Sequence, residues 1–253
     1  MSTDILISVI IPTLNPGPDI DRCLESLRTQ TFGQFEVCVL DGQSTDGTVE
    51  MVHAYIGKIG KELRCLSEPD LGVYDAMNKG ISSSKGEWIY FLGADDVIHD
   101  PEVFADVAKF IATCDADIVY GDVINKSSGA RYDGEFSLDR LLFQRNICHQ
   151  AIFYRRSVFE RLGGYNLRYP IWADWEFNIR CFRHPDICTL WMDRPIAVYN
   201  NKSGLSRGMK DPLFSKELPM ILIRENARLE RKLAKFTKSF RRWSFSRLFR
   251  WRN

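Results

Sequence analysis

The chain has 253 residues, which is enough for one large domain or for a domain with a modest appendage. Hydrophobic residues make up 45% of it and charged residues 26%, as in an ordinary globular protein, so neither a disordered chain nor a disulfide-dependent fold is expected. The seven cysteines form no Cys-x-x-Cys pair, which argues against a zinc or redox site and favours buried thiols in a reducing compartment.

Charge is distributed unevenly along the chain. Residues 228–253 contain ten of the 34 basic residues but only one of the 33 acidic ones, so this segment carries about +9 and the rest of the chain about −8. A body and a tail of opposite charge are expected to contact different partners. We expect a globular domain over residues 1–210 and a helical, basic and aromatic tail over residues 211–253.

The first apolar run extends from Ile5 to Ile11. It is too short to span a bilayer, and it lacks the basic leader and the cleavage site of a secretory signal. It therefore predicts a buried strand, in a protein that stays in the cytoplasm.

Strand and helix patterns alternate through the first half of the chain. Strands are predicted at residues 7–12, 36–40, 63–66, 88–92 and 118–123. The helices between them are predicted at about residues 20–27, 49–56, 73–81 and 100–111. This alternation predicts an α/β fold with a mostly parallel central sheet and helices on both faces. Beyond about residue 130 the pattern is less regular.

Polar clusters follow three of these strands, at residues 13–15, 41–47 and 93–96. In parallel α/β sheets, ligands bind at the carboxyl ends of the strands. The coincidence of polar clusters with strand ends is the strongest indication of a site that the residues give by themselves.

Two of these clusters contain acids that can be interpreted in two ways. Asp41 can accept hydrogen bonds from a nucleobase or a ribose, or it can form a turn. We favour function for Asp41 and a helix cap for Asp46. Asp95 and Asp96 are costly at a buried strand end unless something positive binds there, although such pairs also occur in solvated loops. Mg²⁺ prefers carboxylate oxygen and takes one or two carboxylates plus substrate phosphates.

Two common nucleotide-binding motifs are missing after the first predicted strand. The sequence there contains neither Gly-x-Gly-x-x-Gly nor a Walker-type Gly-Lys-Ser/Thr. Dinucleotide-dependent dehydrogenases and phosphate-loop enzymes therefore lose support.

Taken together, the clusters resemble the inverting glycosyltransferases of family two, which have the GT-A fold. The segments that carry the resemblance are SVIIPTLN at residues 8–15, VLDGQSTDGT at 39–48, EPDLGVYDAMNKG at 68–80, GEWIYFLGADD at 86–96 and ADWE at 173–176. They span roughly residues 6–180, about 70% of the chain. The resemblance implies a GT-A domain over residues 1–210, with a nucleotide-sugar half over about 1–125 and an acceptor half over about 126–210.

The resemblance also implies a nucleotide-sugar donor whose diphosphate is bound through Mg²⁺ or Mn²⁺. Asp96 would coordinate this cation, and Asp95 would face the ribose or share the cation. The family often has a further acid or Asn where Gly93 stands, so two acids are left here. The implied donor-binding residues are Pro12, Thr13, Asn15, Asp41, Gly72, Asn78, Lys79 and Asp95. For Lys79, a solvated helix charge is the alternative.

Asp174 matches the acid that serves as catalytic base in the family. Ala173 stands where Glu is usual, and Glu176 replaces a commoner Asp, so Glu176 can share or take the role. The apolar spacing that follows predicts a helix starting here, so that Asp174 could instead be a helix cap.

Aromatic residues flank the proposed base, and aromatic faces with polar edges suit a sugar acceptor. We assign acceptor binding to His149, Trp172, Trp175 and Glu176. For His149 a structural role is the alternative.

The tail carries aromatic residues near one helical face, with Lys and Arg between them: Phe236, Phe240, Trp243 and Trp251. This pattern favours an amphipathic helix on an anionic membrane surface over a docked basic helix or nucleic-acid binding. We expect a cytoplasmic protein, peripheral on the inner face of the cell membrane, with a glycan or lipid-linked saccharide as acceptor.

The combined prediction is an inverting glycosyltransferase of the hexosyl type, in surface-polysaccharide assembly. A divalent cation would stabilise the leaving diphosphate, and a single general base would activate the acceptor hydroxyl. The alternatives are a nucleotidyltransferase and a non-catalytic nucleotide- or polyanion-binding protein. A nucleotidyltransferase is expected to carry a Gly-rich loop with Arg or Lys after the first strand, and none is present.

Overall fold

The computed structural model describes residues 5–132, 134–200, 210–218 and 220. The chain divides into two compact units, Met1–Lys210 and Asp211–Asn253. In the second unit, residues 212–218 are helical, and the Asp211 carboxylate accepts a hydrogen bond from the backbone N–H of Phe214 at 3.0 Å, as an N-cap does. No helix among the described residues is long and apolar enough to cross a membrane. The aromatic tail residues from Phe236 onward lie outside the described residues.

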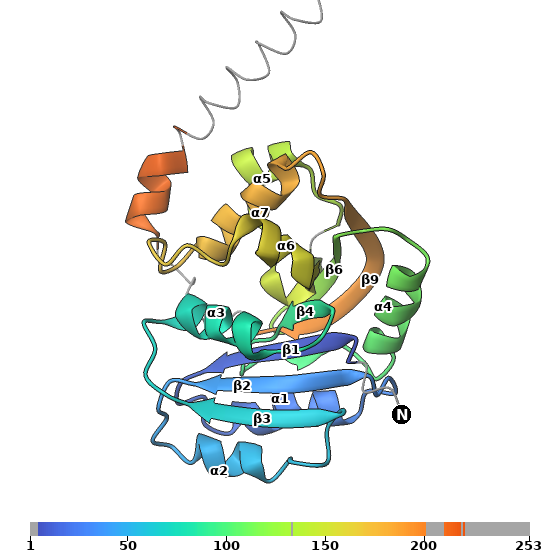
Figure 1. The fold of residues 1–253 in the computed structure, drawn as a ribbon, viewed down its shortest axis with the longest axis vertical. Coiled ribbons are helices and arrows are strands. Elements are labelled where there is room, and N and C mark those ends of the chain that lie inside the picture. Colours follow the sequence, from blue (N-terminus) through green and yellow to red (C-terminus); the bar gives the residue numbers. More distant parts are fainter. Residues whose placement is uncertain (1–4, 133, 201–209, 219, 221–253) are drawn as a thin grey trace, which may run out of the picture. The chain divides into compact units, whose positions relative to one another are not determined.

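The described part of the first unit is built on one nine-stranded sheet, with the order β3-β2-β1-β4-β8-β6-β9-β5 and β7 paired to β6. The strands are β1 Ile7–Thr13, β2 Phe35–Asp41, β3 Glu62–Ser67, β4 Trp88–Phe91, β5 Val97–Ile98, β6 Ile118–Asn125, β7 Arg131–Tyr132, β8 Ile152–Arg155 and β9 Thr189–Tyr199. This mixed α/β sheet with covering helices confirms the predicted fold class (Figure 1).

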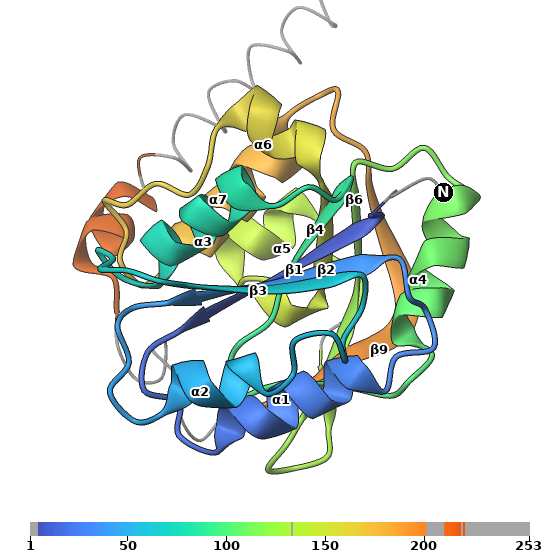
Figure 2. The same cartoon turned by 60° about the horizontal axis from the view of Figure 1, so that its bottom comes forward.

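Helices lie on both sides of the sheet. Figure 2 shows α1 and α2 below it and α3, α6 and α7 above it. The helices are α1 Asp19–Arg28, α2 Thr48–His53, α3 Val73–Ser83, α4 Val103–Ala112, α5 Leu138–Phe143, α6 Arg156–Leu162 and α7 Ala173–Arg183, with a 3₁₀ turn η1 at His149–Ala151. Because both faces are covered, β1 is buried along its whole length, which explains its uninterrupted apolar sequence.

The parallel part of the sheet is shorter than the sequence pattern indicates. Strands β3, β2, β1 and β4 are parallel neighbours, as predicted. The next predicted strand, β6, does not lie beside β4, because β8 pairs with both of them in antiparallel orientation. The parallel pattern resumes only between β6 and β9.

One helix is also shorter than predicted. The helix expected over residues 49–56 ends at His53. Turns follow it, and Gly57 adopts a φ of 76°. This left-handed conformation favours glycine and lies within the turns after the helix, whose C-cap is Ala54.

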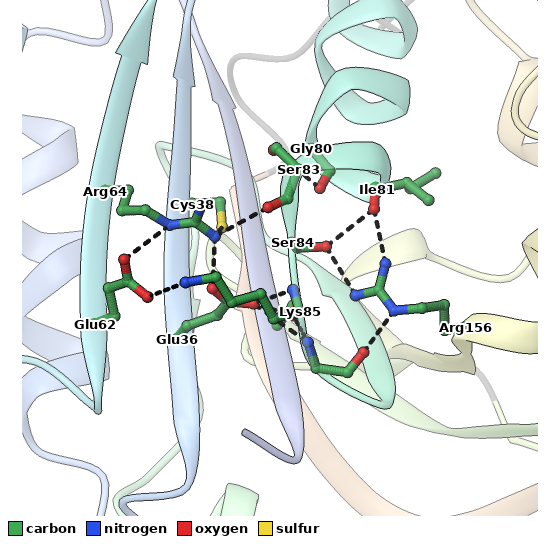
Figure 3. Close-up of polar contacts among 12 residues, drawn as sticks. Glu36, Cys38, Glu62, Arg64, Gly80, Ile81, Ser83, Ser84, Lys85 and Arg156 are labelled. Carbon is green, nitrogen blue, oxygen red and sulfur yellow. Dashed lines mark hydrogen bonds and ion pairs between the residues drawn. The ribbon is translucent and has the colours of Figure 1, made fainter. Parts of the chain in front are cut away.

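At the amino ends of the parallel strands, the buried carboxylate of Glu36 joins several elements (Figure 3). One oxygen accepts hydrogen bonds from the Ser8 hydroxyl at 2.7 Å and from the backbone N–H groups of Lys85 and Gly86. The other oxygen accepts one from the Arg64 guanidinium at 2.6 Å. Burial raises the pKa of Glu36, but these hydrogen bonds outweigh it, so the pKa lies below its ordinary value.

A second cation secures the same edge of the sheet. The guanidinium of Arg156, at the start of α6, donates to the carbonyls of Ile81 and Gly86, each at 2.8 Å, and to the Ser84 hydroxyl at 3.0 Å (Figure 3). It therefore satisfies a carbonyl near the end of α3 and binds the turn that leads to β4.

We expect Glu36→Gln to lower the free energy of unfolding by about 2–3 kcal/mol at pH 7, because an amide cannot accept from all four donors and its own N–H₂ faces some of them. The folded-state pKa is lowered, so this stabilisation is complete above the ordinary glutamate pKa and is lost as the pH falls through the folded-state value. Urea unfolding at pH 7 and near pH 3 measures both effects.

The control for this prediction is Glu62→Gln. Glu62 contacts both Arg64 and Lys85, but its side chain is 37% exposed, so the loss should stay below about 1 kcal/mol. Equal losses in the two variants would contradict the role given to Glu36.

Candidate active site

A cavity of about 670 Å³ lies at the carboxyl ends of β1 and β4. Its walls are the loops after these strands, one face of α3, η1 with the loop before it, and the first turn of α7. This is where ligands bind in parallel α/β sheets. The cavity brings together nine predicted site residues, namely Pro12, Thr13, Asn15, Asp95, Asp96, His149, Trp172, Asp174 and Trp175.

The loop after β1 presents a polar group that lacks a protein partner. Thr13 is 7% exposed, and its hydroxyl has no hydrogen-bond partner among the described residues. Asn15 adopts a φ of 48°, and its side-chain oxygen accepts from the backbone N–H of Thr45 at 2.8 Å. The loop is thus fixed by the neighbouring strand end, while the Thr13 hydroxyl is available to a ligand.

Asp41 does not line the cavity. It is 1% exposed, and its carboxylate accepts from the Ser67 hydroxyl at 2.6 Å and from the backbone N–H of Ser44 at 3.1 Å. Its contacts are those of a residue that shapes the loop after β2. Asp46 was predicted as a helix cap, but the N-cap of α2 is Gly47; Asp46 precedes it and accepts from the backbone N–H of Thr48 at 3.2 Å.

The two acids after β4 are held by residues from distant parts of the chain. Asp96 is 1% exposed and accepts from the backbone N–H of Asn200 at 2.7 Å and from the Gln150 amide. The side-chain amide of Asn200 donates to Asp95 at 3.1 Å. A Cβ at Gly93 would lie 2.4 Å from an Asp96 oxygen, so this placement of Asp96 depends on the glycine.

The surroundings of Asp96 fit a divalent cation. Burial raises the pKa of Asp96 to about 7, and the charge of Asp95 adds to the rise, while the bonds from Asn200 and Gln150 oppose it. No described residue forms an ion pair with Asp96, and the described residues contain no group of three or more His, Cys, Asp or Glu placed to bind a metal. Two carboxylates completed by diphosphate oxygens and water are a ligand set that Mg²⁺ accepts.

Asp174 lies in the first turn of α7 and is 8% exposed. One carboxylate oxygen accepts from the Tyr74 hydroxyl at 2.7 Å, and the other accepts from the Asn146 amide at 2.8 Å. Burial raises the pKa of Asp174, while His149 and the bond from Tyr74 oppose the rise. A raised pKa brings a carboxylate closer to neutral pH, where it becomes a stronger base. The helix N-cap is Trp172, not Asp174.

A chain of hydrogen bonds orients the Asn146 amide. The Tyr154 hydroxyl donates to the Asn178 carbonyl oxygen at 2.7 Å. The Asn178 amide then donates to the Asn146 carbonyl oxygen at 2.8 Å. In this series of hydrogen bonds the side-chain oxygens of Asn178 and Asn146 each accept a bond. The Asn146 N–H₂ must therefore point towards Asp174.

The residues that were predicted to bind the acceptor divide into those that line the cavity and one that does not. His149 has its Nδ1 3.9 Å from an Asp174 oxygen, and burial lowers the pKa of its imidazole, which favours the neutral form. Trp172 and Trp175 line the cavity edge-to-face, with ring centroids 5.4 Å apart. Glu176 does not line the cavity and instead pairs with Arg180 at 2.9 Å.

Three predicted donor residues also lie outside the cavity wall. Gly72 precedes α3 with a φ of 114°, a conformation that favours glycine. Asn78 binds the backbone of Tyr165 twice, accepting from its N–H at 2.9 Å and donating to its carbonyl at 3.0 Å. Lys79 pairs with Glu68 at 3.0 Å and Asp75 at 3.3 Å, which matches the alternative of a helix surface charge.

Comparison with known proteins places this geometry in a family. A family model described as Glycosyl transferase family 2 matches residues 8–163, more than half of the chain. The chain belongs to glycosyl transferase family 2. A PGL/p-HBAD biosynthesis glycosyltransferase of Mycobacterium tuberculosis is 49% identical over 216 residues, which cover 85% of this chain and 84% of the relative.

Solved structures of low sequence identity share the fold of this family member. TarS 1-349 of S. aureus, in complex with UDP-GlcNAc, superposes with a TM-score of 0.65 at 21% identity, covering 81% of this chain and 61% of TarS. The mannosyltransferase PcManGT of Pyrobaculum calidifontis, in complex with GDP-Man and Mn²⁺, gives a TM-score of 0.62 at 21% identity, covering 78% of this chain and 58% of PcManGT. This chain thus spans less than two thirds of either solved chain.

Four residues of the site have no assignment from the sequence pattern: Tyr74, Asn146, Gln150 and Asn200. Tyr74 lies within segment 68–80, which is part of the resemblance to the family, but the sequence pattern predicts only that this residue is helical. Gln150 follows His149 directly. Nothing local marks Asn146 or Asn200, since their partners Asp174 and Asp95 are 28 and 105 residues away along the chain.

We expect Asp174→Asn to melt about 2–4 °C above the wild type at pH 7.5, the size that 1 kcal/mol gives in a domain of this length. Because burial raises the folded-state pKa, wild-type stability is full below the unfolded-state pKa and falls as the pH rises through the folded-state value. An amide at this position can accept from Asn146 and donate to the Tyr74 oxygen, so the variant avoids that loss. Melting curves at pH 4 and 7.5 measure this effect, and an equal difference at both pH values would contradict it.

Proposed function

We propose that this family member transfers a sugar from a nucleoside-diphosphate sugar to a hydroxyl of a glycan or lipid-linked saccharide, with inversion at the anomeric carbon. The proposal rests on the observation that two consecutive residues of η1 lie beside the two buried acids, Asp96 and Asp174. Gln150 contacts Asp96, and His149 lies 3.9 Å from Asp174. One cavity therefore contains a candidate cation ligand and a separate candidate base, the two groups that a direct displacement requires.

In the proposed reaction, Asp174 is the general base. It accepts the proton of the acceptor hydroxyl while that oxygen bonds to the anomeric carbon and the bond to the diphosphate oxygen breaks. A single displacement of this kind inverts the anomeric configuration. Burial, the raised pKa and the lack of an ion pair with any described Lys or Arg support this role.

We assign the binding of Mg²⁺ or Mn²⁺ to Asp96, with Asp95 beside it. A bound cation of this kind would stabilise the negative charge that develops on the leaving diphosphate. The buried carboxylate of Asp96, which forms no ion pair with a described residue, supports this assignment. The Mn²⁺ and GDP-Man in the solved structure of PcManGT agree with it.

The aromatic side of the cavity would bind the acceptor. The Trp175 indole N–H donates to the Leu141 carbonyl at 2.8 Å, which fixes the ring in place. Together with Trp172 it offers aromatic faces of the kind on which sugar rings stack. Neutral His149 can donate or accept a hydrogen bond at the acceptor hydroxyl.

Four donor-side residues take supporting roles in this proposal. Thr13, with its unpaired hydroxyl, would contact the nucleotide, and Pro12 and Asn15 would form the same wall. Asp41 would affect nucleobase binding only indirectly, by holding the loop after β2 in its conformation. The donor class is supported by the UDP-GlcNAc in the TarS complex.

The cellular setting is proposed from the sequence of the tail. The basic and aromatic residues of 211–253 would hold the protein on an anionic membrane surface at its cytoplasmic face, close to a lipid-linked acceptor. We expect the full chain to co-sediment with phosphatidylglycerol vesicles, and a variant ending at Ala227 to stay in the supernatant. Equal co-sedimentation of both would contradict the proposal.

Substitution of Asp96 should abolish donor binding, whereas substitution of Asp174 should lower the rate of transfer. We expect Asp96→Asn to abolish the rise in melting temperature that a matching UDP- or GDP-sugar gives with Mn²⁺, and EDTA to do the same to the wild type. We expect Asp174→Asn to keep that rise but to lower transfer by about 10²- to 10⁴-fold, the usual contribution of a general base. The measurements are thermal shift over a panel of nucleotide sugars and product formation with the sugar that binds.

The matched control is Asp139→Asn, which removes an exposed acid from the first turn of α5, away from the cavity. It should behave as the wild type in both assays.

Glu176→Gln tests the other candidate base. Full transfer by Asp174→Asn, with the loss in Glu176→Gln instead, would overturn the assignment.

A further inference from the structure

The hydroxyl of Tyr74 lies between two acceptors. It is 2.7 Å from an oxygen of Asp174 and 2.8 Å from the carbonyl oxygen of Ile171. A phenol has a single proton and can donate one full hydrogen bond at a time. The hydroxyl oxygen can also accept, so the two contacts can be satisfied together only when Asp174 carries a proton of its own.

Helix α3 fixes this hydroxyl in place by contacts that do not involve it. Tyr74 and Asn78 are one helical turn apart and lie on the same face. Asn78 binds the N–H and the carbonyl of Tyr165, and a Cβ at Gly164 would lie 2.4 Å from the Asn78 oxygen. The ring of Tyr74 also packs against that of Tyr165, with centroids 5.3 Å apart. The segment that leads to α7 is therefore docked on α3, and Tyr74 meets Asp174 at a set distance.

We propose that Tyr74 is the positioning residue of the base: its hydroxyl donates to Asp174 while the carboxylate is charged, and it turns to the Ile171 carbonyl once Asp174 is protonated. This inference rests on the proposed function. The charged carboxylate is the stronger acceptor, so it takes the phenolic proton before the reaction. When Asp174 has taken the proton of the acceptor hydroxyl, it becomes a donor to the Tyr74 oxygen. The phenolic proton stays on Tyr74 and changes only its partner, so no proton is lost or gained.

The other groups around Asp174 do not duplicate this role. Asn146 can only donate to Asp174, because its oxygen is used by Asn178. The remaining titratable groups that influence or are influenced by Asp174 are His149, Cys148, Tyr154 and Tyr165. No Lys or Arg among the described residues forms an ion pair with it. Tyr74 is thus the one hydroxyl that the described structure places in hydrogen-bond contact with Asp174.

The test is a titration of Asp174 in the full-length protein, by ¹³C NMR of labelled carboxyl groups, with Asp174→Asn identifying the signal. Tyr74→Phe removes the donor to the charged form, so the midpoint should move up by about one pH unit. The matched control is Tyr165→Phe. Tyr165 is also buried, but its hydroxyl donates no hydrogen bond to Asp174, so the midpoint should move much less than in Tyr74→Phe.

A second variant guards against a folding defect in Tyr74→Phe. Incorporation of 3-fluorotyrosine at residue 74 keeps the shape of the ring and makes the phenol a stronger donor, so the midpoint should move down. An unmoved midpoint in both variants overturns the assignment of Tyr74. The pH–rate profile, measured with the nucleotide sugar hydrolysed fastest in a UDP- and GDP-sugar panel, should shift by the same amount. A midpoint that moves while this profile does not would leave the contact in place and overturn Asp174 as the base.

Discussion

The antiparallel pairing of β8 with β4 is the constraint from which the arrangement of the site follows. In the register observed, Trp88 pairs with Arg155 and Tyr90 with Phe153, so the beginning of β8 lies beside the end of β4. The turn η1, which precedes β8, is thereby brought to the place where β4 delivers its two acids. A hydrogen bond from the Tyr90 hydroxyl to the Gln150 carbonyl at 2.9 Å fixes the same junction. A parallel neighbour would have placed its polar end there instead, and η1 would lie at the opposite edge of the sheet.

The number of donors around a buried carboxylate decides what that carboxylate can do. Glu36 is fully buried and accepts from four donors, so its pKa is lowered and it acts as a permanent anchor between strands. Asp174 is nearly as buried, and burial raises its pKa because the two neutral donors that it accepts from do not offset the loss of solvent. The same functional group is thus held ionised at the amino edge of the sheet and is kept able to take a proton at the carboxyl edge. The ionised Glu36 stabilises the fold at the amino edge, whereas the burial of Asp174 at the carboxyl edge lowers stability when this carboxylate is charged.

The parts of the fold that could be predicted from the sequence are those set by local patterns. The parallel strands β1 to β4 lie within two residues of their predicted bounds, because apolar runs and turn residues mark both ends. Placement of Thr13 and Asp96 in one cavity followed from the rule that carboxyl ends of parallel strands meet. The antiparallel insertion of β8 could not be predicted, since the pairing is decided by contacts more than 60 residues apart. Asn146 and Asn200 lack a local signal because their partners, Asp174 and Asp95, are 28 and 105 residues away along the chain.

The predicted residues that lie outside the cavity show what a short motif can conceal. In segment 68–80, Tyr74 lines the cavity, while Asn78 binds the backbone of Tyr165. A motif therefore records two kinds of requirement, namely the groups that meet a ligand and the groups that hold other elements in register with them. Only the first kind can be recognised by its chemistry alone. The Asn78 side chain is of a type that often binds ligands, but here it binds the backbone of Tyr165. Because Asn78 lies one helical turn after Tyr74, this contact also fixes the position of Tyr74. It holds α3 against the segment before α7, and so sets the distance at which a phenol meets the acid.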